Sequence, residues 1–152
     1  MRLLILGTGG MANSHVMHFS QISGVELIAA VDVDDVVVRA FAVRHNIPLT
    51  FTSLDDALAW GEFDAAANVT PDAIHHPTTL KLLAAGKHVF CERPLAETYA
   101  KAAEMAEAAE TAGLIGMVNL TYRNVAPLQA ARQMVTEGRI GKLRHLEASY
   151  LQ

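Results

Sequence analysis

The sequence contains a single cysteine, no block of positive charge and no apolar run long enough to cross a membrane. Cys91 cannot form a disulfide within the chain, which is typical of a reducing compartment, so we expect a cytoplasmic location. The 12 lysine and arginine residues against 16 aspartate and glutamate residues give a net charge of −4, which favours neither a nucleic acid nor a membrane as partner. Val25–Val31, one of the longest apolar stretches, falls far short of the roughly 18 residues of a membrane span.

The 152 residues leave room for one domain, and 51% hydrophobic against 18% charged residues indicate a chain that folds around a core. Apolar runs of strand length recur between segments with helical spacing, at Leu3–Leu6, Val25–Val31, Leu49–Phe51, Ala65–Val69, His88–Cys91 and Ile115–Leu120. Strands that alternate with helices predict a parallel sheet. Because apolar residues follow one another in these runs and do not alternate with polar ones, we expect helices on both faces, that is, a doubly wound α/β fold.

Residues with known capping preferences mark the helix ends. Ser53 and Thr98 carry the hydroxyl that a helix N-terminus favours, and Pro71 suits a first helical position. Gly113 and Gly138 can adopt the left-handed conformation that ends a helix. The sequence predicts helices near Met11–Ile22, Tyr99–Ala112 and Pro127–Glu137.

A glycine-rich segment joins the first predicted strand to the first predicted helix and matches GxGxxG/A: Gly7-Thr8-Gly9-Gly10-Met11-Ala12. Gly7 would allow the tight turn, Gly9 would let the backbone approach a pyrophosphate, and Ala12 would let the helix pack closely on the sheet. The phosphates would bind free N–H groups at the helix N-terminus, around Gly10 and Met11. The motif predicts a Rossmann fold, although a glycine-rich turn alone need not bind a ligand.

An acidic residue at the end of the second strand supports dinucleotide binding. Asp32 lies 20 residues after Ala12, where a carboxylate can accept hydrogen bonds from the adenosine ribose hydroxyls. No arginine follows that could neutralise a 2′-phosphate, and further carboxylates would repel one, so we predict NAD in preference to NADP. We assign Asp34 and Asp35 themselves to a solvated helix start.

Three other classes of nucleotide-binding protein are excluded by their own signatures. A methyltransferase places an acid before the first glycine, where this chain has Leu4-Ile5-Leu6. A Walker loop needs Gly-Lys-Ser/Thr, which is not found in this turn. A short-chain dehydrogenase needs Tyr-x-x-x-Lys, whereas Tyr99 is followed by Lys101 two positions on.

The end of the chain has a different pattern. Leu143–Ala148 alternates between two unlike faces, which predicts a strand. Too few residues follow to complete another domain. We therefore interpret residues 1–142 as a dinucleotide-binding domain and residues 143–152 as the start of a truncated second domain, in a piece of a longer protein.

Cys91-Glu92-Arg93-Pro94-Leu95-Ala96 resembles the Glu-Lys-Pro signature of the Gfo/Idh/MocA oxidoreductases, which include glucose-fructose oxidoreductase and inositol dehydrogenase. Other segments similar to that family are Gly10–His15, Thr70–His75, Gly86–Val89, Tyr122–Arg123 and Gly138–Lys142. The resemblance covers essentially the whole chain. It implies hydride exchange between a nicotinamide cofactor and a carbinol carbon of a sugar, inositol or related polyol. It also implies a following α/β domain, absent here, that supplies substrate and homo-oligomer contacts.

The resemblance assigns further residues to the site. Thr70, Pro71 and His75 would lie along the nicotinamide-side ribose, with Glu92 and Arg93 nearest the chemistry. The family's usual lysine is Arg93 here, and a guanidinium stays charged, so Arg93 can orient a substrate oxygen but cannot readily act as a general base. The alternative is a surface arginine in a turn fixed by the proline that follows it.

Several of these side chains have plainer interpretations. His15 and His18 have a spacing that could hold zinc, but no cysteine or acidic cluster completes a site, and we expect no metal. His75 could instead cap backbone groups or face solvent, and we expect Cys91 to be a buried strand residue.

Two functions therefore remain open. The first is the NAD-binding domain of an oxidoreductase, inactive without the rest of the parent protein. The second is a dinucleotide-binding module without catalysis, serving regulation or partner binding.

Overall fold

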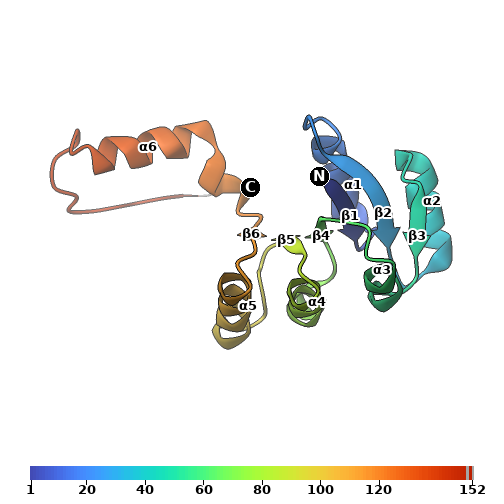
Figure 1. Ribbon diagram of the computed structural model, residues 1–152. Helices are drawn as coiled ribbons and strands as arrows, with labels where there is room; N and C mark the ends of the chain where they lie inside the picture. The colour runs from blue at the N-terminus through green and yellow to red at the C-terminus, as the bar shows by residue number, and fades with distance from the viewer. Residues whose placement is uncertain (150, 152) are drawn as a thin grey trace. The chain divides into compact units, whose positions relative to one another are not determined.

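The computed structural model describes residues 1–149 and 151. Its elements in chain order are β1 (Arg2–Leu6), α1 (Gly10–Phe19), β2 (Glu26–Val31), α2 (Asp35–His45), β3 (Leu49–Phe51), α3 (Leu54–Trp60), β4 (Ala65–Asn68), α4 (Asp72–Ala84), β5 (His88–Cys91), α5 (Tyr99–Thr111), β6 (Gly116–Val118), the 3-10 helix η1 (Thr121–Asn124) and α6 (Ala126–Thr136) (Figure 1). The six strands predicted from the apolar runs are confirmed, with small shifts at their ends.

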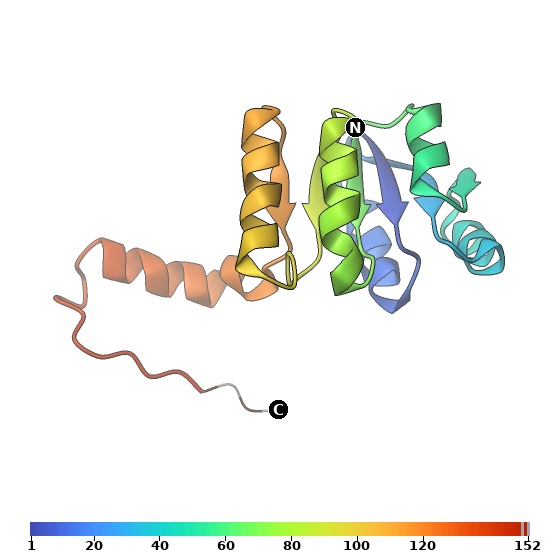
Figure 2. The same cartoon turned by 90° about the horizontal axis from the view of Figure 1, so that it is seen from below.

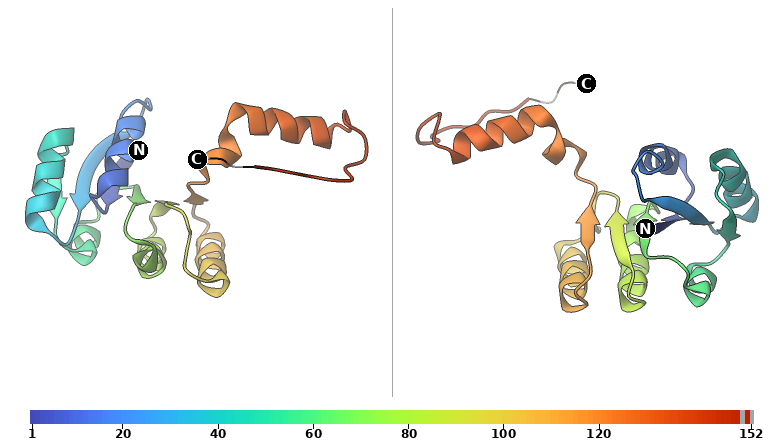
Figure 3. Two further views of the ribbon diagram at one scale, coloured as in Figure 1. Left: turned by 180° about the vertical axis from the view of Figure 1, so that it is seen from behind. Right: turned by 45° about the horizontal axis from the view of Figure 1, so that its top comes forward.

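The strands form one parallel sheet in the order β3-β2-β1-β4-β5-β6, and their arrows point the same way in Figure 2. Side chains of β1 alternate between two cores: Leu3 and Ile5 pack with residues of α1 and α2, whereas Leu4 and Leu6 pack with residues of α3, α4 and α5. Helices thus cover both faces of the sheet (Figure 3), and the predicted doubly wound α/β fold is confirmed.

The helix ends largely follow the predicted caps. The Ser53 hydroxyl accepts the Asp56 N–H, and the Thr98 hydroxyl accepts the Lys101 N–H. Pro71 is the N-cap of α4 and lies one position before the first helical residue, so the prediction of a first helical position is wrong by one residue. Its ψ of 150° is extended, because the chain is still leaving the loop at this point.

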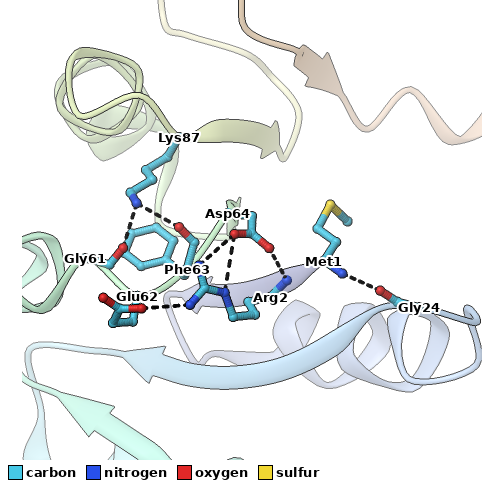
Figure 4. A network of polar contacts seen from close by, with 8 residues as sticks. All are labelled: Met1, Arg2, Gly24, Gly61, Glu62, Phe63, Asp64 and Lys87. Carbon is cyan, nitrogen blue, oxygen red and sulfur yellow. Dashed lines mark hydrogen bonds and ion pairs between the residues drawn. The ribbon is translucent and has the colours of Figure 1, made fainter.

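Polar contacts fasten the amino edge of the sheet, where the strands begin (Figure 4). The Arg2 guanidinium donates to the Asp64 carboxylate (3.0 Å), and the Lys87 ammonium donates to the carbonyl oxygens of Gly61 and Phe63, each at 2.7 Å. Lys87 Nζ also lies 4.6 Å from the centre of the Phe63 ring. These contacts join β1 and the start of β5 to the segment before β4, so they serve the fold.

The chain divides into two compact units, Met1–Asn119 with the sheet and Leu120–Gln152 with η1 and α6. The helix predicted near Pro127–Glu137 is confirmed as α6. None of the described helices is long and apolar enough to cross a membrane.

The strand predicted at Leu143–Ala148 is wrong, because these residues have no regular secondary structure. A strand needs a neighbour that satisfies its backbone N–H and C=O groups, and in the described part of the chain no strand of the sheet pairs with this segment. Tyr150 and Gln152, which belong to the predicted second domain, lie outside the described residues.

Candidate functional site

The candidate site lies at the carboxyl edge of the sheet, where β1 and β4 pair. From β1 the sheet continues through β2 to β3, and from β4 it continues through β5 to β6, so the order reverses between β1 and β4. Open α/β sheets bind ligands at this switch point, outside the carboxyl ends of the strands. The loops after β1, β2, β4 and β5, together with the first turns of α1 and α4, carry the predicted site residues.

Gly7 makes the turn that leaves β1. Its φ is +88°, and a Cβ at this position would lie 2.8 Å from the Val69 carbonyl oxygen. Its N–H donates to the Val31 carbonyl oxygen (2.8 Å), which holds the turn against the end of β2. The tight turn predicted at Gly7 is therefore confirmed, and no side chain fits there.

The N-terminus of α1 follows this turn. Gly9 is its N-cap, and no side chain among the described residues caps the helix there. A Cβ on Gly9 or Gly10 would meet nothing within 4 Å, and Met11 is exposed, so the space outside the first turn is open. Ala12 is fully buried, as close packing of α1 on the sheet requires. An uncapped helix N-terminus with open space before it suits an anion such as a pyrophosphate.

Asp32 is held against the glycine turn by Thr8. The Thr8 N–H and hydroxyl both donate to Asp32 Oδ2, at 2.9 and 2.7 Å, and the Asp34 N–H donates to Oδ1 at 3.3 Å. Partial burial would raise the pKa of Asp32, but these hydrogen bonds outweigh it and lower the pKa. The ionised carboxylate joins the ends of β1 and β2 and keeps acceptor capacity on Oδ1 for a hydroxyl.

Asp34 and Asp35 belong to the start of α2, as predicted. Asp34 Oδ1 accepts the N–H groups of Val36 and Val37, at 2.9 and 3.1 Å. Asp35 pairs with Arg39 one helical turn later, at 2.8 Å. Asp34 therefore adds negative charge next to Asp32, whereas Arg39 balances the charge of Asp35.

The loop after β4 is built around two fully buried polar side chains, Asn68 and His75. Asn68 Oδ1 accepts the Thr70 hydroxyl at 2.7 Å. His75 Nε2 lies 2.7 Å from the Thr70 carbonyl oxygen, and Nδ1 lies 2.8 Å from the Pro94 carbonyl oxygen. His75 thus ties the loop after β4 to the turn after β5 and does not face solvent. Its place beside a cofactor stays a prediction, and its effect there would be indirect.

Glu92 directly follows β5 and is only 8% exposed. Its Oε1 contacts His15 Nε2 and accepts the Asn119 amide, both at 2.6 Å, while Oε2 accepts the Arg93 N–H at 2.9 Å. Burial would raise the pKa of Glu92, but the hydrogen bonds from Asn119, Arg93 and His15 lower it on balance. The carboxylate is an anchor inside the protein, so a direct contact of Glu92 with a cofactor also stays a prediction.

Arg93 and Cys91 differ sharply in exposure. Arg93 is exposed, and within the described part of the chain no side chain pairs with its guanidinium. Cys91 is 1% exposed, and burial raises the pKa of its thiol to about 11, so it stays protonated. The prediction of a buried strand cysteine is confirmed.

His15 and His18 do not converge on a shared site. His15 turns inward to Glu92, whereas His18 Nδ1 lies 2.7 Å from the Ser14 carbonyl oxygen at the surface. Among the residues that the structure describes, no three His, Cys, Asp or Glu side chains gather as metal ligands.

Sequence reasoning missed the roles of Thr8, Asn68 and Asn119. Asn68 carries a signal that could have found it, because it is the polar residue within the apolar run Ala65–Val69. Thr8 occupies a variable position of the glycine motif, and Asn119 is a polar residue inside the run Ile115–Leu120. Neither position indicates a partner, because both partners are distant in sequence.

We expect the free energy of unfolding to fall as the pH decreases below about 4.5. The pKa values of Asp32 and Glu92 are lowered in the folded state, so the stability that they contribute is present in full above their unfolded pKa values and is lost as the pH falls through the folded ones. Urea unfolding at a series of pH values measures this loss. Glu92→Gln cannot titrate and should lose less stability on acidification; an equal loss would contradict the role of Glu92.

A comparison with family models matches residues 1–120 to the Gfo/Idh/MocA model, described as an oxidoreductase family with an NAD-binding Rossmann fold. Among curated proteins, the 1,5-anhydro-D-fructose reductase of Ensifer adhaerens is 33% identical over 138 residues, which cover 91% of this chain and 41% of the reductase. A scyllo-inositol 2-dehydrogenase (NADP(+)) of Bacillus subtilis is 27% identical over 151 residues, which cover 99% of this chain and 45% of that enzyme.

Solved structures agree with this grouping. The WlbA dehydrogenase from Bordetella pertussis, solved with NADH and UDP-GlcNAcA, superposes with a TM-score of 0.86 at 27% identity and covers 93% of this chain and 44% of its own. The chain therefore spans less than half the length of these relatives.

Proposed function

Because the chain belongs to the Gfo/Idh/MocA oxidoreductase family with its NAD-binding Rossmann fold, we propose that it forms the cofactor-binding part of an enzyme that transfers hydride between a nicotinamide cofactor and a carbinol carbon of a sugar, inositol or related polyol. One observation carries the proposal: an open helix N-terminus follows β1, and a hydrogen bond from Thr8 connects it to the ionised Asp32 after β2.

The residues present fit a dinucleotide. In this proposal Gly7, Gly9, Gly10, Met11 and Ala12 form the turn and helix start that bind the pyrophosphate, because the backbone there is open and uncapped among the described residues. Asp32 accepts the adenosine ribose hydroxyls through the carboxylate that Thr8 orients. When bound, the nicotinamide would supply the hydride chemistry.

The strands on the other side of the switch point would serve the nicotinamide half. Thr70 and Pro71 lie in the loop after β4, beside the phosphate cradle formed by Gly7–Ala12. His75 and Glu92 hold that loop and the next turn in place. Arg93 is exposed and carries a permanent positive charge next to this turn, so it can orient a substrate oxygen. The proton that accompanies the reaction would be handled outside this chain.

We predict that the chain binds NADH more tightly than NADPH. Asp32 and Asp34, whose backbone N–H donates to the Asp32 carboxylate, place negative charge at the corner where a 2′-phosphate would lie, and like charges repel. Calorimetric titration of both cofactors measures the difference in affinity. At high salt the two affinities should become more similar, because salt screens the repulsion. Equal or tighter binding of NADPH would contradict the prediction that these carboxylates repel a 2′-phosphate.

Arg93→Ala in the full-length parent is expected to lower kcat by about 100-fold, the usual loss when a charge-stabilising donor is removed. NADH affinity should change little, because Gly7–Ala12, Asp32 and the backbone contact of Arg93 with Glu92 are all kept. Arg93→Lys should restore only part of kcat, since an ammonium lacks the planar fork. A panel of sugars and polyols provides the substrate. If Arg93→Ala keeps the full kcat of the wild type, Arg93 is a surface residue of the turn without a role in the reaction.

One observation favours a second candidate function, a dinucleotide-binding module without catalysis: Arg93 replaces the lysine that the family signature usually carries. Absence of turnover by the parent across the panel, with NADH binding retained, would support this alternative.

We further propose that the protein works in the cytoplasm and that the full-length parent forms homo-oligomers, without nucleic acid or membrane partners. The single buried cysteine and the acidic net charge of −4 support this setting. Light scattering of the parent would measure its mass in solution.

A further inference from the structure

The contact between His15 and Glu92 crosses the site from one functional element to another. His15 belongs to α1, the helix whose N-terminus the proposed function assigns to the phosphates, and Glu92 opens the turn that carries Arg93. Their side-chain atoms lie 2.6 Å apart although the residues are 77 positions apart in sequence. Each residue is 8% exposed, so the contact is shielded from water.

The environment of His15 restricts its ring. The ring lies 5.9 Å from the Phe19 ring in a stacked arrangement and 5.5 Å from the Phe90 ring in an edge arrangement, measured between centroids. Packing between two aromatic rings leaves Nε2 directed at Glu92. Because an ionised carboxylate only accepts hydrogen bonds, Nε2 must carry the hydrogen.

We propose that His15 is a positioning residue that couples the phosphate-binding helix α1 to the Arg93 turn through the Glu92 carboxylate. The proposal rests on the proposed function, because it is the bound dinucleotide that would make this coupling useful. His15 is buried, and its ring contacts the site through Glu92, so it acts only through that carboxylate.

The coupling depends on the two Glu92 carboxylate oxygens having different partners. Oε1 is held by His15 and Asn119, and Oε2 accepts the backbone N–H of Arg93. The carboxylate is planar, so its orientation at Oε1 sets the position of Oε2 and hence of the Arg93 backbone. Without the His15 contact, Asn119 alone would hold Oε1, so the Glu92 side chain would regain part of its rotamer freedom and the turn would have a less fixed acceptor.

The same turn is held from the other face of the sheet. His75 contacts the Pro94 carbonyl oxygen at 2.8 Å, so the backbone on both sides of the Arg93–Pro94 bond has a buried partner. Loss of His15 should therefore loosen the Arg93 side of the turn and leave the contact at Pro94 in place.

The first arm of the test needs no ligand. Amide hydrogen exchange of the 152-residue chain is measured by NMR for wild type, His15→Leu, His15→Gln and His18→Leu. His15→Leu should speed exchange at Arg93 by about tenfold, because the N–H loses a well-placed acceptor. His15→Gln places an amide N–H near Nε2 and should restore most of the protection. His18→Leu is the matched control on the same helix, since His18 makes only a local surface contact.

The second arm compares two probes, NADH and ADP-ribose, by calorimetry on the same variants. His15→Leu should weaken the binding of NADH by about tenfold and change the binding of ADP-ribose by no more than about twofold. Only NADH carries the nicotinamide that would reach the loops after β4 and β5. A general loss of stability would weaken both probes equally. Glu92→Gln should act in the same direction, and the double variant His15→Leu/Glu92→Gln should lose no more than the larger single loss.

The outcomes separate the two proposals. Unchanged exchange at Arg93 in His15→Leu, or equal weakening of both probes, overturns the positioning role while the proposed function stands. A wild type that binds neither probe overturns the proposed function, and the coupling falls with it. If His15→Leu does not fold, His15→Gln and Glu92→Gln decide: Glu92→Gln must release the Arg93 N–H and His15→Gln must not, and any other pattern overturns the proposal.

Discussion

Replacing Gly7 with alanine is expected to lower the free energy of unfolding by about 3 kcal/mol or more. Two penalties add at this position. An alanine would have to adopt the positive φ of +88°, and its Cβ would lie 2.8 Å from the Val69 carbonyl oxygen, which is backbone and cannot rotate away. The turn after β1 would have to move, and with it the start of α1. Urea unfolding followed by circular dichroism measures the loss.

Two other glycines separate the causes. Gly24 has a φ of +82° and a Cβ there would meet nothing within 4 Å, so Gly24→Ala should show the conformational cost alone, about 1 kcal/mol. Gly9 has no positive φ and open space around it, so Gly9→Ala should keep stability within about 0.5 kcal/mol but weaken NADH, since the added methyl group occupies the approach to the helix N-terminus. Equal losses in Gly7→Ala and Gly24→Ala would show that the close approach to Val69 is unimportant.

Asp32→Ala is expected to weaken NADH binding by about 10- to 100-fold and to narrow the preference over NADPH. Losing a charged acceptor costs about 1.5–3 kcal/mol, which corresponds to one to two decades in affinity. The substitution also removes the partner of the Thr8 N–H and hydroxyl, so the turn after β1 loses an anchor. Calorimetric titration of NADH and NADPH provides the measurement.

Matched variants distinguish a binding role of Asp32 from a structural one. Thr8→Val removes one hydrogen bond to the carboxylate but keeps its charge, and it should cost far less affinity than Asp32→Ala. Lys87→Met removes the contacts to Gly61 and Phe63 at the amino edge of the sheet, and it should reduce stability without changing NADH affinity. If Asp32→Ala folds and binds NADH like wild type, Asp32 serves only to hold Thr8.

The sequence by itself predicted the architecture and the cradle. Six apolar runs of strand length, continuous instead of alternating, require cover on both faces, and this requirement is local enough to be read from the sequence. The spacing of Gly7 and Ala12 predicted a tight turn and a closely packed helix, and the burial of Ala12 and the positive φ of Gly7 agree with it. The capping role of Ser53 is local in the same way.

A prediction failed where a local pattern needs a distant partner. The alternation over Leu143–Ala148 is typical of a strand, but strands are made by inter-strand hydrogen bonds, and in the described part of the chain no other strand provides them. Alternation states only which side chains could share a face.

Only the tertiary structure decided how the candidate site is held. The motif did not distinguish Thr8 from any other residue between two glycines, yet Thr8 orients Asp32 from 24 positions away. His75 could have faced solvent or a ligand, and the fold instead buries it between two carbonyl oxygens. Glu92 and His15 meet across 77 positions because β5 lies next to β4 and α1 packs over that part of the sheet. Composition and spacing describe neighbours along the chain. Buried polar groups need hydrogen-bond partners, and these can be distant in sequence, so only the fold determines which partners they are.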